Sequence, residues 1–275
     1  MLNAILASHE LLLGLAQALV AAALALGVAL VARSRGIRLF SDTVISLVRG
    51  LTQMIAVGYI FVLLLRGPRW ISPFVLAAMI VAAAATSSRR ARGFPGAFRI
   101  SLTAIFCGAG LVITVMTVLG AIDTAVSALI PVGSMLIANA MNANALALDR
   151  FRSEVDAHRG EIESALALGA APGATVRDPM QNALRASLIP PIDNLRSLGI
   201  VWIPGLMAGM LLSKGSPVYA SIYQFVVLAM ILGSSGLTCM VSTWLMSQAA
   251  FSPAEQLVMR PAPVRAGAAG GRLGR

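Results

Sequence analysis

Apolar residues occur along most of the chain in long, continuous runs. The run 19–32, LVAAALALGVALVA, is typical of them. A helix that rises about 1.5 Å per residue needs about 20 apolar residues to cross roughly 30 Å of hydrocarbon. Because the strands of a membrane barrel alternate apolar and polar positions, the continuous runs favour helices. They predict an all-α integral membrane protein, a bundle of about seven transmembrane helices, at 11–32, 44–65, 71–85, 100–120, 125–148, 198–212 and 218–246.

Composition supports lipid as the solvent of these helices. The chain is 58% hydrophobic and 12% charged, with a mean hydropathy of +0.84, whereas about a quarter of the residues of soluble domains are charged. The net charge of +10 lies mainly in the segments between apolar runs, which argues for membrane lipid and against nucleic acid as the partner. Since cytoplasmic loops retain Lys and Arg, we expect a multi-pass protein of the bacterial inner (plasma) membrane with its N-terminus outside and its C-terminus cytoplasmic.

One segment differs from its surroundings, because 149–197 contains most of the acidic residues. We expect a cytoplasmic segment within a permease domain that covers 1–251. A stop and restart signal at 169–173 predicts two short helices, the second at about 174–188 and ending before Pro190 and Pro191. This pair is either a hairpin packed on its own bundle or a docking element. The remaining residues, 252–275, are rich in Pro, Gly, Ala and Arg, which predicts a disordered basic cytoplasmic tail.

Polar side chains inside the apolar runs mark candidate positions on a substrate path, because polar groups in hydrocarbon usually face a bundle interior or water. Asn139 and Asn142 are three residues apart and share a helix face. Hydrogen bonds between helices would explain such residues equally well. The candidates are Gln53, Ser134, Asn139 and Asn142, with Asn144 as a further one.

The cysteines and methionines, which often bind metals in other proteins, do not form a recognisable metal site in this sequence. Cys107 and Cys239 both fall in apolar runs and are interpreted as small buried hydrophobes. The methionines favour packing over a path for soft metals. We therefore expect no metal site and no cofactor bound by this chain. Gly205 and Gly209 form a step of small residues that lets helices approach closely, within one chain or between two copies.

Several stretches resemble one family of transporters. The segment 163–169, ESALALG, resembles the E-A-A-x-x-x-G motif of ABC importer permeases, with Ser at the second position. Other blocks are similar to the Fet-type iron-export ABC permeases, a family that includes plant aluminium-tolerance membrane subunits. These blocks are 49–58, 133–142, 161–172, 204–209 and 215–224.

The resemblance implies a permease subunit of an ATP-driven exporter of metal ions such as iron, working as a homodimer. It also implies that 163–169 is a coupling helix for a separate ABC ATP-binding subunit. Since Lys214 is the chain's one lysine and Gly215 follows it, the phosphate-binding G-x-x-x-x-G-K-[ST] motif is absent. ATP-Mg would bind to the partner, so the chain is not itself an enzyme. The residues implied in ATPase coupling are Glu161, Glu163, Ala165, Gly169 and Pro172.

Two alternatives remain open. A permease of the same ABC architecture would carry another solute, such as a sugar nucleotide or a lipid-like molecule. An ATPase-independent channel or secondary carrier would need no ATP-binding partner. The absence of acidic residues at membrane depth leaves no evident proton relay, which counts against a proton-coupled carrier.

Overall fold

The computed structural model describes residues 2–36, 40–65, 67–68, 70–91, 94, 96–213 and 215–259. These residues form helices and no named strand, so the predicted all-α membrane fold is confirmed for the described part of the chain. Within that part, six helical stretches are long and apolar enough to cross a membrane. Lys214 and the tail residues 260–275 lie outside the described residues.

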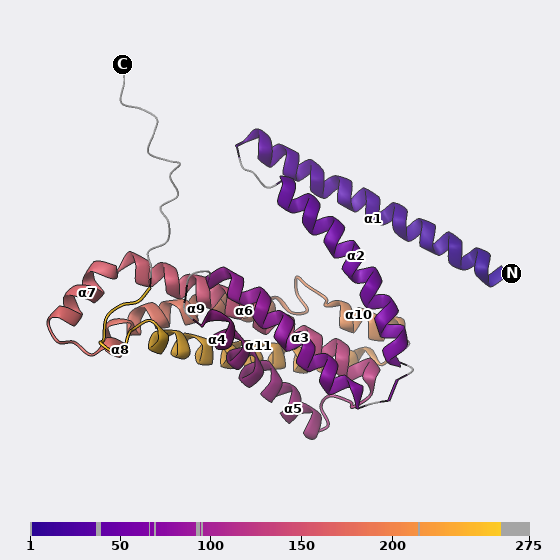
Figure 1. The fold of residues 1–275 in the computed structure, drawn as a ribbon. Helices are drawn as coiled ribbons and strands as arrows, with labels where there is room; N and C mark the ends of the chain where they lie inside the picture. The colour runs from indigo at the N-terminus through magenta and orange to yellow at the C-terminus, as the bar shows by residue number, and fades with distance from the viewer. Residues whose placement is uncertain are drawn as a thin grey trace, which may run out of the picture. The chain divides into compact units, whose positions relative to one another are not determined.

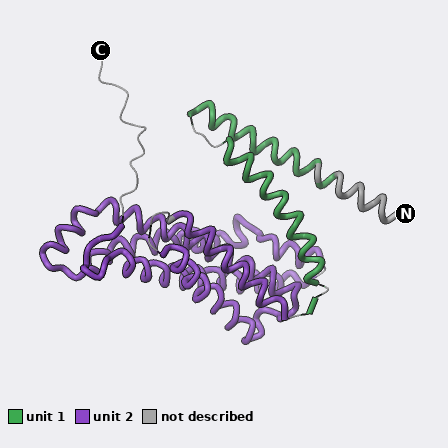
Figure 2. Tube along the Cα trace, in the orientation of Figure 1, with its two compact units in different colours: residues 1–68 green, residues 69–275 purple. Residues whose placement is uncertain are grey.

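The chain divides into two compact units, Met1–Pro68 and Arg69–Arg275, shown in Figure 2. The predicted domain 1–251 therefore takes in the first unit and most of the second. The first contains α1 (Leu2–Ser34) and α2 (Phe40–Leu65), which pack against each other. At their connection, the guanidinium group of Arg33 lies 6.0 Å from the ring centroid of Phe40.

The second unit is a helical bundle (Figure 1) whose described residues include four of the six spanning stretches. Its helices are α3 (Ile71–Ser88), the 3₁₀ turn Arg89–Ala91, α4 (Ala97–Ile105), a π-helical turn at Phe106–Gly110, α5 (Leu111–Val118), α6 (Val126–Ala157), α7 (Arg159–Ala167), α8 (Pro172–Thr175), α9 (Arg177–Ser197), α10 (Gly205–Leu212) and α11 (Pro217–Ala249).

The central apolar cluster of this unit joins four parts of the chain. It contains Leu76 of α3, Ile105 of α4, Leu136 of α6 and Val227 of α11, all buried. A second cluster lies near α7 and joins the last turns of α6 and α11. The bundle thus has one core at its centre and another at the end that carries α7 and α8.

The predicted span 198–212 is wrong as a continuous helix. Residues 198–204 are irregular, and α10 has 8 residues, about 12 Å of helix where a crossing needs about 30 Å. Figure 1 shows α7 and α8 at one end of the unit and α10 near the other. The chain therefore returns to the start of α11 through α9, the linker 198–204 and α10, a broken pass instead of a helix.

The predicted end of the second short helix is also corrected. The helix α9 continues through Pro190 and Pro191 to Ser197, although proline removes a helical hydrogen bond. It packs against both α6 and α11, and this packing holds the helix across the prolines. Consequently α9 belongs to the bundle, and the part that projects from the predicted segment 149–197 is α7 with α8.

The beginning of the tail is ordered, contrary to expectation. Met259 is 3% exposed and packs in the second cluster, and Val258 donates a backbone hydrogen bond to Ala250. Ser252 and Gln256 close the intervening turn with a backbone hydrogen bond of 2.8 Å. Residues 252–259 therefore fold back against the end of α11.

The π-helical turn approaches α11 very closely. A Cβ atom on Gly108 would lie 2.6 Å from the backbone nitrogen of Thr238 and 2.7 Å from the carbonyl oxygen of Ser234. Both contacts are with the backbone of α11, which a rotamer change cannot relieve. Only glycine fits this approach.

We predict that Gly108→Ala destabilises the protein, by about 1–3 kcal/mol, the usual cost of overpacking. Thermal unfolding in detergent measures this. Gly233→Ala on α11 is the matched control, because a Cβ there meets nothing within 4 Å; it should leave stability unchanged or raise it slightly. Equal melting temperatures for the Gly108 variant and the parent would contradict the contact.

Candidate functional site

The helices α7 and α8 form a projection at one end of the bundle, which we call the tip (residues 159–175). Gly169 has φ +88, donates its N–H to Leu166 over 2.9 Å, and is followed by Ala170, which donates to Ala165 over 3.0 Å. This pair of bonds is a Schellman cap with glycine in the left-handed position. Pro172 then starts α8, where its missing N–H costs nothing. The predicted stop and restart is confirmed.

The tip has a buried underside and an exposed end. Ile162 is 3% exposed and packs with Phe151 and Val155 of α6 in the second cluster. Leu168, by contrast, is 89% exposed beside the glycine turn. The tip is thus anchored to the bundle while it presents one large apolar side chain to its surroundings.

The two candidate carboxylates differ in their contacts. Glu163 is exposed and accepts a hydrogen bond from the guanidinium of Arg159, four residues earlier, over 3.2 Å. Glu161 lines a pocket of ≈ 420 Å³ between α6, α7, α8 and α9, together with Ala165 and Asp178. The structure therefore brings Glu161 and Ala165 to one groove and leaves Glu163 paired within α7.

Arg159 also connects the tip to the tail. Besides Glu163, its guanidinium contacts Asp156 of α6 over 3.4 Å and donates to the backbone carbonyl of Met259. Three elements, the end of α6, the first turn of α7 and the ordered start of the tail, meet at this one side chain. Nothing in the sequence pattern pointed to this junction.

The candidate path residues do not gather around one cavity. Ser134 donates to the carbonyl of Pro131 over 2.7 Å and Asn139 to that of Met135 over 2.8 Å, both within α6. Asn142 is exposed, and Gln53 is exposed on α2 in the other unit. The shared face predicted for Asn139 and Asn142 is thus half-buried at one residue and open at the other.

Asn144 is instead the polar centre of the bundle. It is fully buried, and its amide donates to the hydroxyl oxygens of Ser87 in α3 and Ser101 in α4, each over 3.0 Å. Along α11 a row of hydroxyl side chains is also buried, namely Ser234, Ser235, Thr238, Ser242 and Thr243. Residues three and four apart lie on one face of a helix, so this spacing could have predicted a buried polar face that the candidate residues of the sequence analysis do not include.

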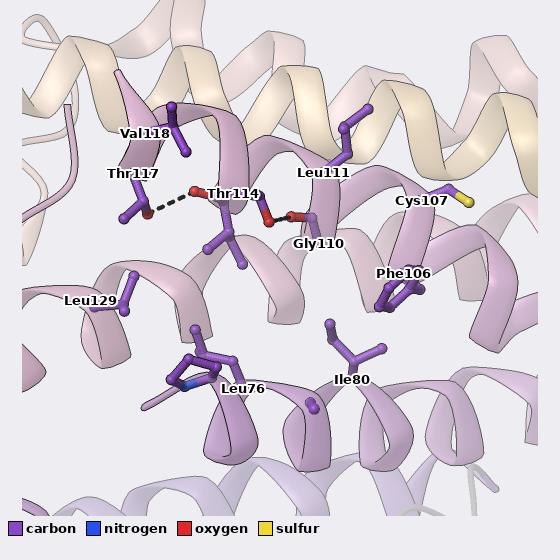
Figure 3. A pocket seen from close by; sticks show the side chains of 13 residues that line it. Leu76, Ile80, Phe106, Cys107, Gly110, Leu111, Thr114, Thr117, Val118 and Leu129 are labelled. Atoms are coloured by element: carbon purple, nitrogen blue, oxygen red, sulfur yellow. Dashed lines mark hydrogen bonds between the residues drawn. The ribbon is translucent and has the colours of Figure 1, made fainter. Parts of the chain in front are cut away.

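A larger pocket of ≈ 610 Å³ opens between α3, the π-helical turn, α5 and α6 (Figure 3). Leu76, Ile80 and Leu129 line it, and the hydroxyls of Thr114 and Thr117 donate to carbonyls of their own helix over 2.8 and 2.7 Å. Cys107 lies at its edge and is exposed, so its expected burial is wrong; Cys239 is buried as expected. With its hydroxyls already bonded, this pocket suits apolar groups.

Within the described residues, neither the possible metal ligands nor the pair Gly205 and Gly209 forms a site. Among the described residues, no three His, Cys, Asp or Glu side chains lie together as metal ligands would. Met135 and Met141 pack against the central cluster, as the packing interpretation expects. Gly205 and Gly209 are exposed, and a Cβ on either would meet nothing within 4 Å. The step is therefore not used inside this described unit.

We predict that Asn144→Leu lowers thermal stability in detergent, because it removes two bonds between helices, worth about 0.6–2 kcal/mol each in membrane proteins. Asn139→Leu is the matched control, since Asn139 bonds only within α6, and its melting temperature should stay close to the parent's. Equal effects of the two substitutions would show that Asn144 is not a tie between helices.

Comparisons with known proteins agree on one family. The family described as "Uncharacterised protein family (UPF0014)" matches residues 15–251. The "UPF0014 membrane protein STAR2" of Oryza sativa subsp. japonica is 30% identical over 90% of this chain and 88% of its own length. The "Probable iron export permease protein FetB" of Escherichia coli (strain K12) is 28% identical over 84% and 89%, and the "Protein ALUMINUM SENSITIVE 3" of Arabidopsis thaliana is 28% identical over 82% of both. No solved structure matches the chain significantly. This chain, a multi-pass helical membrane protein, belongs to the UPF0014 family.

Proposed function

We propose that this chain is the membrane-spanning permease subunit of an ATP-driven ABC transporter that exports metal ions such as iron. The observation that carries the proposal is the tip: a short helix anchored by Ile162, ended by a glycine cap at Gly169, and bearing the exposed Leu168. A contact that transmits force to an ATPase needs a rigid element of this kind. The similarity to a protein named as a probable iron export permease supports the substrate class.

The ATP-binding subunit is a separate polypeptide in this proposal, and ATP-Mg binds there. Leu168 would enter an apolar hollow of that partner, and Glu161 with Asp178 in the adjacent groove would face basic residues of it. Two copies of this chain would assemble with two ATP-binding subunits in the bacterial inner membrane. The tip would face the cytoplasm with the C-terminus, as the distribution of Arg predicts, and the N-terminus would lie outside.

The substrate path is proposed to involve Ser134, Asn139 and Asn142 of α6 and Gln53 of α2. The support is chemical: amide and hydroxyl oxygens suit hard cations better than thioethers do. Asn142 is the most informative of the α6 residues, because it is exposed in its own unit and its replacement disturbs no hydrogen bond described within the bundle.

We predict that Gly169→Val lowers permease-stimulated ATP hydrolysis in proteoliposomes that contain the chain and its ATP-binding partner. A β-branched residue at φ +88 costs on the order of 1 kcal/mol or more and displaces the turn. The matched control is Gly160→Val, also on α7, where φ is not positive and a Cβ meets nothing within 4 Å.

Adding Leu168→Asp to the Gly169 variant should abolish copurification with the ATP-binding subunit. Leu119→Asp should not, although it is an equally drastic change at an exposed leucine; Leu119 directly follows α5, which lies away from α7 and α8 (Figure 1). If the double variant still bound the ATPase and stimulated hydrolysis at the parental rate, the coupling element would be assigned wrongly. Failure of the parent itself to copurify with any ATPase would refute the ABC proposal.

We predict that inside-out vesicles containing the complex take up Fe²⁺ when ATP is added, and that vanadate stops this uptake. Asn142→Leu should reduce uptake while the complex still assembles. Uptake of a sugar nucleotide or a lipid-like solute instead of Fe²⁺ would favour the other ABC substrates, and uptake that ignores both ATP and vanadate would favour a channel or carrier.

A further inference from the structure

The segment that follows α11 closes on itself at the end of the bundle that carries α7 and α8 (Figure 1). Ala250 directly follows α11, and its carbonyl accepts the backbone N–H of Val258 over 2.9 Å. Within this loop, the hydroxyl oxygen of Ser252 accepts the N–H of Gln256 over 3.2 Å. Residues 250–259, which we call the C-terminal turn, are therefore held in one conformation by their own hydrogen bonds.

The C-terminal turn adds a side chain to the core that anchors the tip. Met259 is 3% exposed and belongs to the same buried cluster as Ile162 of α7 and Phe151 of α6. These residues come from three separate parts of the chain. Because a closely packed core responds to a change in any of its members, an altered side chain at Met259 affects the packing beneath α7.

Arg159 adds a polar connection between the same three elements. Its side chain is 23% exposed, and its guanidinium contacts Asp156 of α6 over 3.4 Å and Glu163 of α7 over 3.2 Å. The same group donates to the backbone carbonyl of Met259 in the C-terminal turn. A planar guanidinium offers several donors in a fixed geometry, so one side chain holds the end of α6, the first turns of α7 and the C-terminal turn together.

The connection between α6 and α7 makes such contacts important. The helix α6 ends at Ala157 and α7 begins at Arg159, so His158 alone separates them. Its φ of −104 and ψ of 18 lie outside the α-helical range. Because two dihedral angles at this residue relate one helix to the other, the angle between them is kept by side chains on both sides. Ile162 supplies an apolar contact for α7, and Arg159 supplies a polar one.

We propose that the C-terminal turn is a brace that fixes the direction of α7, and that Arg159 is the positioning residue through which the brace acts. The inference rests on the proposed function in one respect, since the direction of α7 affects transport only where the tip contacts an ATP-binding subunit. Arg159 contacts neither ATP nor the transported ion in this assignment. It acts through Glu163 and the backbone of α7, which it holds relative to α6.

Hydrogen exchange of the full-length chain, measured without the ATP-binding subunit, tests the brace by itself. Met259→Gln places an amide in the buried cluster, so the backbone N–H groups of residues 162–168 should exchange at least about tenfold faster than in the parent. Val258→Gln is the matched control, because the neighbouring Val258 is 45% exposed. Its exchange at 162–168 should equal the parent's.

Arg159→Met tests the positioning residue in the same experiment. Methionine keeps an apolar stem and removes the guanidinium, and exchange at 162–168 should rise as it does in the Met259 variant. Arg196→Met is the matched control, since Arg196 pairs with Asp193 over 3.5 Å within α9 and is exposed; it should change nothing at 162–168. Unchanged exchange in both test variants would overturn the brace, and a rise in the Arg159 variant alone would show that the C-terminal turn takes no part.

ATP hydrolysis in proteoliposomes separates positioning from folding. With increasing ATP-binding subunit, Arg159→Met should lower the maximal stimulated rate at least about fivefold, while the half-saturating concentration of that subunit and the melting temperature of the chain stay at parental values. A lower melting temperature with weaker binding of the subunit would mean that Arg159 only stabilises the fold. Parental rates in both test variants, despite faster exchange, would refute the coupling role of the brace alone. Failure of the parent to stimulate any ATPase, with the exchange results as expected, would refute the proposed function alone.

Discussion

Within hydrocarbon, a backbone N–H or C=O group has no partner except protein, and much of this structure depends on that constraint. The six long helices found in the described part of the chain satisfy it by their own hydrogen bonds. Some of their hydroxyl side chains do the same: Thr114, Thr117 and Ser134 each donate to a carbonyl three or four residues earlier. The linker 198–204 is the exception, because the carbonyls of Ile200 and Val201 accept no backbone hydrogen bond from the described residues.

The second unit holds its helices together by close fit and by buried polar groups, since apolar side chains gain little by leaving lipid for one another. Gly108 allows the π-helical turn to touch the backbone of α11. Asn144 ties α6 to α3 and α4 through two hydroxyl groups. Such contacts depend on individual atoms, so a single methyl group at Gly108 affects the bundle more than a larger change on its lipid-facing side.

The sequence predicted those features that are local in the chain. Apolar run length located the continuous spans, and the Gly and Pro of 169–172 located the cap at Gly169. It did not predict the break at 198–204, because hydropathy measures composition and not whether a backbone is helical. Spacing placed Asn139 and Asn142 on one face but could not show which face packs inward, so the buried Asn144 was given too little weight. The order of 252–259 comes from contacts with residues about 100 positions away, such as Arg159.

In the proposed transporter, α9 connects the tip to the linker 198–204 and α10. Val176, directly before α9, is buried in the same cluster as Ile162 of the tip, and Met246 of α11 and Ala250, directly after α11, pack there too. A displacement of the tip therefore acts on the beginning of α9 and on the end of α11 together. Since α9 ends at Ser197 and the linker that follows is not helical, a displacement transmitted along α9 reaches irregular backbone before it reaches α10. Movement at the ATPase contact would thus pass along α9 to the linker and α10, which the hydrogen bond from the backbone N–H of Met207 to the side-chain oxygen of Gln224 holds against α11.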